Sequence, residues 1–107
     1  MLTIRVQMGV AKMNAAQPIG LTEIATAARC STRALQEAFR RHRSTTPLAY
    51  LRQVRLESAH DDLLGSDPTN ATVAEIANRW GFAHQGRFAT LYRKEYGWTP
   101  GHTLAKL

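Results

Sequence analysis

The stretch that decides the fold is TVAEIANRWGF, residues 72–82. Thr72 stands three residues before Glu75, which is the spacing of a capping box that satisfies the free N–H groups at the start of a helix. The helix then runs through Ile76 and Trp80 to Gly81. Glycine readily adopts the positive φ that ends a helix and lets the chain turn sharply. The stretch therefore predicts a helix followed by a tight turn.

A second, amphipathic helix follows this turn. Phe88, Leu91 and Tyr92 fall at i, i+3 and i+4, so they form a stripe that packs inward. The outer face carries polar and basic side chains, namely Gln85, Arg87, Thr90, Arg93 and Lys94. Two helices joined by so short a turn, the second with a polar and basic outer face, are typical of a helix-turn-helix.

The sequence contains this pattern twice. Glu23-Ile24-Ala25 recurs as Glu75-Ile76-Ala77, at an offset of 52 residues. Five further pairs match at an offset of 53: Leu35 with Phe88, Phe39 with Tyr92, Arg41 with Lys94, Pro47 with Pro100 and Leu51 with Leu104. Because the matches are apolar anchors and helix breakers in the same order, we infer two tandem helix-turn-helix units.

The first copy follows the same order with one irregular position. Gly20 is at the helix cap, Ser31 is a good N-cap for the second helix, and Leu35 and Phe39 face inward with Ala38. Arg29 occupies the turn, where a side chain with a Cβ is strained at positive φ. We expect a less ideal turn here but the same fold.

A long helix is expected between the copies. Thr46-Pro47 reads as a cap followed by proline at the first helical position, and the helix should run over 47–64. Its apolar residues, which can serve both units, are Leu48, Leu51, Val54, Ala59 and Leu63. It ends in the turn-forming run GSDPTN, residues 65–70. The chain is therefore divided into a first subdomain (1–46), a linker helix (47–64) and a second subdomain (65–107).

The length of this linker suggests how DNA is read. Eighteen helical residues span about 27 Å. Successive major grooves on one face of B-DNA are about 34 Å apart. We expect one molecule to read two adjacent grooves and to bend the duplex.

Charge and composition favour a polyanionic partner. The 107 residues carry a net charge of +6 and a pI near 10.3, and all of the excess lies in residues 1–53, with eight basic against two acidic residues. By itself, a positive run is more often a solvated face than a binding site.

The sequence also bears on location. The lone Cys30 excludes an intrachain disulfide. The absence of a long apolar span or signal sequence predicts a soluble, cytoplasmic protein that does not bind membranes.

Enzymatic chemistry finds no support in the sequence. Asp61 and Asp62 are adjacent on a helix and point about 100° apart, so they do not pair across a cleft. The four histidines are scattered without metal-ligand spacing and are interpreted as surface or cap residues, and no phosphate-binding glycine loop is present. No cofactor, no metal site and no catalytic residue is expected.

Five segments carry a family resemblance: LTEIA (21–25), STRALQEAFR (31–40), RLESA (55–59), EIANRWGF (75–82) and GWTP (97–100). Together they resemble the DNA-binding domain of the AraC/XylS family of bacterial transcription regulators, over about residues 21–104. The resemblance implies an all-α fold of seven helices, in which a long central helix joins two homeodomain-like helix-turn-helix subdomains. It also implies that a separate ligand-sensing or dimerising domain is attached in the full-length protein.

The resemblance also implies which side chains face base edges. They are Arg33, Gln36 and Glu37 in the first unit, and Gln85, Gly86, Arg87 and Thr90 in the second. Arginine pairs with guanine and glutamine with adenine. For Glu37 two roles stay open: it accepts a hydrogen bond from cytosine, or it repels misplaced phosphate. Thr90 replaces the family's usual arginine, Gly86 its usual serine, and Ser44 a frequent glycine. We therefore expect the first unit to be the stronger base reader.

The remaining polar residues of the basic faces are assigned to the DNA backbone, where charge matters more than geometry. They are Thr32, Arg40, Arg41, Arg43, Arg52, Arg93 and Lys94. Core positions are expected at Leu35, Phe39, Trp80, Phe82, Phe88 and Trp98.

Double-stranded DNA is thus the expected partner of a transcription regulator. The alternative is a protein-interaction module whose basic helices bind an acidic partner such as RNA polymerase. Arg33 and Gln36 are the residues that distinguish the two hypotheses.

Overall fold

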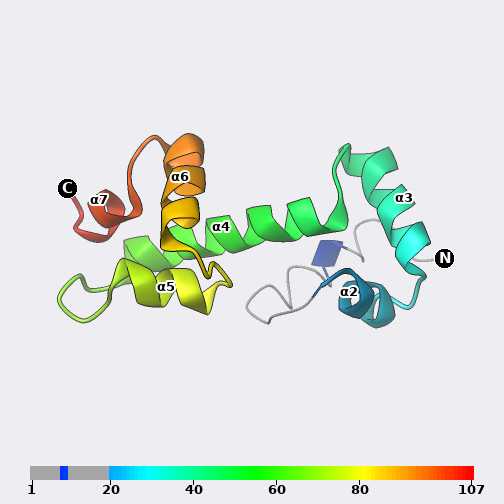
Figure 1. Cartoon of the computed structure of the whole chain (residues 1–107), viewed down its shortest axis with the longest axis horizontal. Helices are drawn as coiled ribbons and strands as arrows, with labels where there is room; N and C mark the ends of the chain where they lie inside the picture. Colours follow the sequence, from blue (N-terminus) through cyan, green and yellow to red (C-terminus); the bar gives the residue numbers. More distant parts are fainter. Residues whose placement is uncertain (1–7, 10–19) are drawn as a thin grey trace. The chain divides into compact units, whose positions relative to one another are not determined.

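The computed structural model describes residues 8–9 and 20–107, and all regular structure in that part of the chain is helical (Figure 1). The helices of residues 20–107 are α2 (Leu21–Ala27), α3 (Thr32–Arg43), α4 (Pro47–Gly65), α5 (Val73–Arg79), α6 (Gln85–Tyr96) and α7 (Pro100–Leu104). The all-helical prediction is confirmed for these residues. Six helices are seen there, whereas the resemblance implies seven. Of the residues before Gly20 the structure describes only Met8 and Gly9, and both are helical.

The chain divides into two compact units, Met1–Val54 and Arg55–Leu107. The boundary falls inside α4, which begins at the expected Pro47 and ends at Gly65, one residue later than expected. This helix therefore contributes side chains to the core of each unit.

The core of the first unit joins α2, α3 and the first half of α4. Its buried members are Ile24, Ala25, Leu35, Phe39, Leu51 and Val54. Cys30 and Tyr50 are half-buried and pack against this cluster. Full burial of a leucine or phenylalanine side chain stabilises a fold by about 1.5 to 3 kcal/mol. These contacts are therefore the main reason that so short a set of helices holds together.

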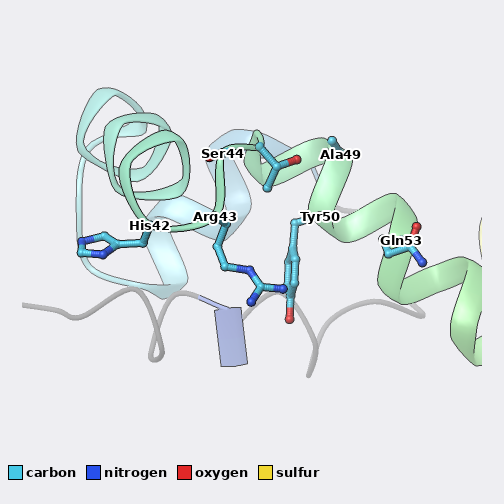
Figure 2. Close-up of a pocket in the computed structure, with 7 residues that line it drawn as sticks. His42, Arg43, Ser44, Ala49, Tyr50 and Gln53 are labelled. Atoms are coloured by element: carbon cyan, nitrogen blue, oxygen red, sulfur yellow. The ribbon is translucent and has the colours of Figure 1, made fainter.

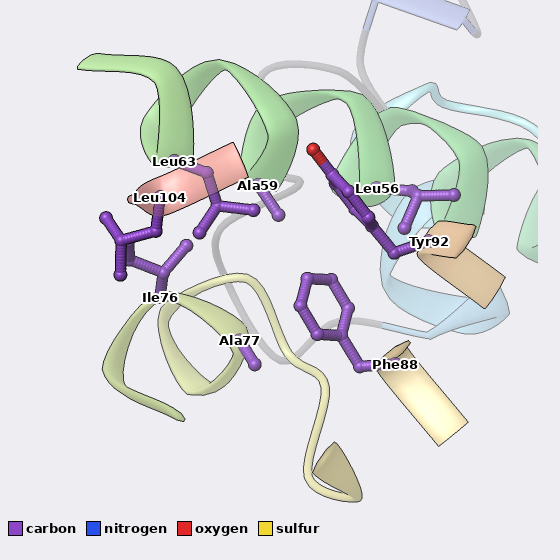
Figure 3. Close-up of a cluster of buried hydrophobic side chains, with 8 residues drawn as sticks. All are labelled: Leu56, Ala59, Leu63, Ile76, Ala77, Phe88, Tyr92 and Leu104. Carbon is purple, nitrogen blue, oxygen red and sulfur yellow. The ribbon is translucent and has the colours of Figure 1, made fainter. Parts of the chain in front are cut away.

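The core of the second unit joins the second half of α4 to α5, α6 and α7 (Figure 3). Its buried members are Leu56, Ala59, Leu63, Ile76, Ala77, Phe88, Tyr92 and Leu104. Trp80 and Phe82 lie half-buried against it, and the Phe82 ring is 4.9 Å from that of Phe88. Five of the six expected core residues are thus in or against a core: Leu35, Phe39, Trp80, Phe82 and Phe88.

Two apolar residues expected to pack inward are exposed. Trp98 is 58% exposed, and its ring stacks on His102 at 4.5 Å, because the neighbouring positions Pro100 and Leu104 are the ones that α7 buries. Leu48 is 48% exposed, because the inward positions of α4 are its neighbours Pro47 and Leu51. Leu56 in α4 was not expected in the core and is buried.

A carboxylate of α4 attaches the end of α5 within the second unit. Asp62 Oδ2 accepts hydrogen bonds from Arg79 Nη1 at 2.6 Å and from Trp80 Nε1 at 3.0 Å. Its other oxygen, Oδ1, accepts from the Ser66 hydroxyl at 3.2 Å. Burial raises the pKa of the Asp62 carboxyl, but the hydrogen bonds from Trp80, Arg79 and Ser66 outweigh this and hold the pKa below its ordinary value.

A second polar chain links α4, α6 and α7. His60 Nδ1 lies 2.7 Å from the Tyr92 hydroxyl, which donates to Thr103 Oγ1 at 2.8 Å. Burial raises the pKa of Tyr92, so its phenol stays protonated and can donate. The His60 ring also stacks on Tyr96 at 4.0 Å. His60, interpreted from the sequence as a surface or cap residue, is therefore a half-buried packing residue.

The turns that follow α3 and α6 differ at their left-handed residue: the first unit has serine where the second has glycine. The second helix of each unit ends at a residue with left-handed backbone, Ser44 (φ 52°) after α3 and Gly97 (φ 81°) after α6. We expect Ser44→Gly to raise the free energy of unfolding by about 0.5 to 1 kcal/mol, because relief of left-handed strain exceeds the entropic cost of glycine.

The reciprocal exchange, Gly97→Ser, is the matched control. A side chain there meets no atom within 4 Å, so only the backbone conformation is changed, and the free energy of unfolding should fall by a similar amount. Urea denaturation followed by circular dichroism measures both. Destabilisation by Ser44→Gly would contradict the strain assigned to this position.

Stability should also depend on the charge of Asp62. Its folded-state pKa is lowered, so the stabilisation is fully present above the unfolded-state value of about 3.9 and is lost as the pH falls through the folded-state pKa. We expect Asp62→Asn to lower the free energy of unfolding by about 1 to 2 kcal/mol at pH 7 and by progressively less below pH of about 4. Urea denaturation at a series of pH values tests this. A difference that stays constant down to pH 3 would count against the ionised carboxylate as the stabilising group.

Candidate nucleic-acid interface

The orientation of α3 follows from its buried stripe. Leu35 and Phe39 are 0% exposed, so this face of the helix is held against α2 and α4. The Ser31 hydroxyl caps the helix by accepting from the amide of Ala34 at 3.0 Å, as the sequence predicted. Because residues on one helix are separated by 100°, the polar positions of α3 on the opposite side face outward, while Ala38 is half-buried beside the stripe.

The turn between α2 and α3 has a defined hydrogen-bond pattern. The amide of Cys30 donates to the carbonyl of Ala25 at 3.0 Å, and the amide of Arg29 donates to that of Thr26 at 3.1 Å. This pair of bonds is the Schellman motif, which requires a left-handed residue, and Arg29 has φ 57°. The strained turn expected from the sequence is confirmed.

The turn between α5 and α6 repeats this geometry with glycine. The amide of Phe82 donates to the carbonyl of Ala77 at 2.8 Å, and the amide of Gly81, with φ 85°, donates to that of Asn78 at 3.1 Å. At the start of α5 the Thr72 hydroxyl accepts from the amide of Glu75 at 3.2 Å, which confirms this half of the predicted capping box. The two motifs therefore have the same local construction.

The expected base-reading residues are all exposed on the second helices of the two motifs. Those of the first unit, Arg33, Gln36 and Glu37, lie on the outer face of α3, and those of the second, Gln85, Gly86, Arg87 and Thr90, lie on α6. Burial of Phe88 and Tyr92 orients α6 just as Leu35 and Phe39 orient α3. Each helix thus brings its own set together on one solvent-facing side.

Local interactions involve three of these side chains. Arg33 Nε lies 3.5 Å from Glu37 Oε1, with 89% of the arginine side chain exposed, so water screens this ion pair and a stronger acceptor can replace it. The Thr90 hydroxyl donates to the carbonyl of Gly86 at 3.0 Å, one turn back. That bond uses the only hydroxyl hydrogen of Thr90, so the hydroxyl oxygen can only accept a hydrogen bond from DNA.

The expected phosphate-binding residues are also exposed: Thr32, Arg40, Arg41, Arg43, Arg52, Arg93 and Lys94. Arg43 differs from the rest, because its guanidinium lies over the Tyr50 ring, 5.7 Å from the centroid. Figure 2 shows these two side chains in a shallow pocket lined by the end of α3 and the start of α4. This contact restrains Arg43 and lowers the entropy it would lose on binding an anion.

Charge is concentrated on the two outward-facing helices. Helix α3 has four arginines and one glutamate, and α6 has three basic residues and one glutamate. Arg29 was not among the residues assigned to DNA from the sequence, but it is exposed just before α3 and adds a positive charge beside that helix. Its place two residues before Ser31, the predicted N-cap of α3, is the signal that points to this.

Other kinds of site are not found in the described part of the chain. Among residues 8–9 and 20–107, no group of three or more metal-binding side chains comes together. Of the helices seen there, none is both long enough and apolar enough to cross a bilayer. The exposed basic helices therefore remain the principal candidate site of these residues.

Comparison with known proteins agrees with this geometry. Residues 24–106 match a family model described as a helix-turn-helix domain. The crystal structure of a probable AraC family transcriptional regulator from Rhodopseudomonas palustris superposes with a TM-score of 0.83 at 33% sequence identity, covering 96% of this chain and 94% of that one. The chain belongs to the AraC/XylS family. Members of this family are transcription regulators and not enzymes.

Curated relatives in the family are longer than this chain. The probable thc operon regulatory protein of Rhodococcus erythropolis is 38% identical over 101 residues, which are 94% of this chain and 30% of that protein. The XylDLEGF operon transcriptional activator 2 of Pseudomonas putida is 36% identical over 92 residues, 86% of this chain and 59% of that protein. The chain thus spans between about a third and three fifths of these relatives, and it contains the AraC-type helix-turn-helix domain with which the family binds DNA.

Proposed function

We propose that this chain is the DNA-reading part of a transcription regulator that binds double-stranded DNA in a sequence-specific manner. The observation that carries the proposal is the paired construction of α3 and α6: each is held by a fully buried apolar stripe and exposes a polar, basic face. A solvent-facing helix of this kind fits the major groove, where base edges present a unique pattern of donors and acceptors.

In this proposal the chain has three parts: a first helix-turn-helix subdomain (1–46), a linker helix (47–64) and a second subdomain (65–107). A short N-terminal helix completes the seven of the family. The two recognition helices occupy adjacent major grooves and the duplex bends to meet both, because a helix as long as α4 rises only about 28 Å against about 34 Å between grooves.

The two units contribute unequally. Arg33, Gln36 and Glu37 read bases from the first unit, where the basic residues are also concentrated. Gln85, Gly86, Arg87 and Thr90 face the second groove, but Thr90 is restricted to accepting and Gly86 has no side chain. We propose that the second unit chiefly grips the backbone and sets the bend.

Thr32, Arg40, Arg41, Arg43, Arg52, Arg93 and Lys94 complete the proposed interface by contacting phosphates. In the full-length protein we propose a separate ligand-sensing or dimerising domain, since the relatives are longer than this chain. We further propose RNA polymerase as a protein partner and the cytoplasm as the location.

Selection of bound sites from a random oligonucleotide pool tests the proposal directly. We expect a two-part motif whose halves are about one helical turn apart, retained in gel shifts against random competitor DNA. The selected site placed at different positions along one fragment should also show position-dependent mobility, which reports the bend. Loss of DNA retention even at low salt would instead favour a protein-interaction module.

Replacing Arg33 by Ala should separate base reading from charge. We expect discrimination at one base pair to relax, at a cost of about 1 to 3 kcal/mol against the preferred base. The matched control is Arg40→Ala on the same helix, which should weaken all sequences alike and lower the slope of log affinity against log salt by about one unit. Equal weakening of all sequences by Arg33→Ala would contradict its assignment. Titrations on single-base variants of the selected site at several salt concentrations distinguish these outcomes.

A further inference from the structure

The two motifs share a backbone geometry but differ in how the first helix of each is attached. At the end of α5, Arg79 and Trp80 both donate to Asp62 Oδ2 of α4, at 2.6 and 3.0 Å. The matching positions at the end of α2, 52 residues earlier, are Ala27 and Ala28, whose methyl groups donate no hydrogen bond. The polar attachment is therefore a property of the second unit.

The acceptor itself is held in place. The Asp62 side chain is only 20% exposed, and Oδ1 accepts from the Ser66 hydroxyl at 3.2 Å. The same hydroxyl is 2.6 Å from the Asp62 carbonyl oxygen. The single hydrogen of this hydroxyl is shared between the two acceptors, so Oδ1 has a weaker partner and Oδ2, which faces α5, accepts the two strongest bonds of the carboxylate.

This attachment acts at the turn that leads into α6. Trp80 is the C-cap of α5, and its backbone amide donates to the carbonyl of Ile76 at 3.3 Å, while the amide of Gly81 donates to that of Asn78 at 3.1 Å. The next residue is Gly81, whose left-handed backbone turns the chain toward α6, which begins at Gln85. A shift of the Trp80 indole therefore moves the turn and, with it, the first residues of α6.

We propose that Asp62 is a positioning residue for DNA reading by the second unit. Because phosphate repels a carboxylate, we assign Asp62 no contact with DNA. It acts through Trp80 and Arg79, which fix where Gln85, Gly86 and Arg87 lie in the groove. The proposal rests on the proposed function of α6. It explains how a recognition helix with few base-reading side chains can still be placed accurately, since a rigid helix loses less conformational entropy on binding.

The experiment compares two DNA duplexes derived from the site selected by the wild-type protein. One carries both halves and the other has the half bound by α6 scrambled. Asp62→Ala should lower affinity for the intact duplex roughly tenfold, as expected for the loss of charge-assisted hydrogen bonds, and should hardly change affinity for the scrambled one. Asp62→Asn keeps an acceptor for Trp80 and should restore part of this loss.

Two further variants separate positioning from stability. Thr72→Ala removes the cap at the other end of α5, so it destabilises the same helix without touching Asp62, and it should leave affinity for the intact duplex unchanged at a temperature where it stays folded. Trp80→Phe removes the N–H donor. It should weaken binding to the intact duplex less in the Asp62→Ala protein than in the wild type, because the two side chains act through one hydrogen bond. Circular dichroism confirms that each protein compared is folded.

The outcomes are distinct. If Asp62→Ala weakens both duplexes equally, or if Thr72→Ala reproduces its effect at matched stability, Asp62 only stabilises the fold and the proposal is overturned. If the wild type prefers the intact duplex but Asp62→Ala binds as the wild type does, this proposal fails while DNA reading by α6 stands. A wild type that does not distinguish the two duplexes would overturn DNA reading by α6 itself, and with it the role of Asp62.

Discussion

The structure depends on burying one apolar stripe on the second helix of each motif. Leu35 and Phe39 in α3, like Phe88 and Tyr92 in α6, are completely excluded from solvent. Because a helix buried along one line has no freedom to rotate, burial also decides which side chains remain outside. The polar face that we assign to DNA is thus the geometric complement of the core, and the same four buried residues set both the packing and the direction of this face.

Helix α4 supplies what each motif lacks. A two-helix motif of this size buries little surface by itself, and α4 closes the first core with Leu51 and Val54 and the second with Leu56, Ala59 and Leu63. Polar contacts then refine the second unit, through Asp62 to the end of α5 and through His60 to Tyr92 in α6. The second unit has little net charge by sequence, so its proposed role depends more on accurate placement of α6 than on attraction.

The two copies have diverged in complementary ways. The first has arginine and serine at left-handed positions where the second has glycine, Arg29 against Gly81 and Ser44 against Gly97. The first therefore stores backbone strain of a kind often found at functional sites, while the exposed Arg29 side chain adds charge beside α3. The second has the less strained turns and the more extensive polar anchoring. This division agrees with a first unit that reads bases and a second that grips the backbone.

Much of the fold was determined by the sequence alone, because its signals are local. The caps at Ser31 and Thr72, the turns at Arg29 and Gly81 and the spacing of the buried stripes each act within one or two helical turns, and all were found where predicted. The exposure of the expected base-reading residues follows from the same periodicity. Their contacts with DNA remain a prediction.

Only the tertiary structure decided which residues meet across elements. An apolar side chain such as Trp98 is equally suited to the core or to the surface, and it is exposed because Pro100 and Leu104 occupy the inward positions of α7. The roles of Asp62 and His60 were not predicted from the sequence, since their partners are Trp80, 18 residues away, and Tyr92, 32 residues away. Periodicity within one helix specifies which face is buried, but it carries no information about the side chain that a distant helix brings to that face.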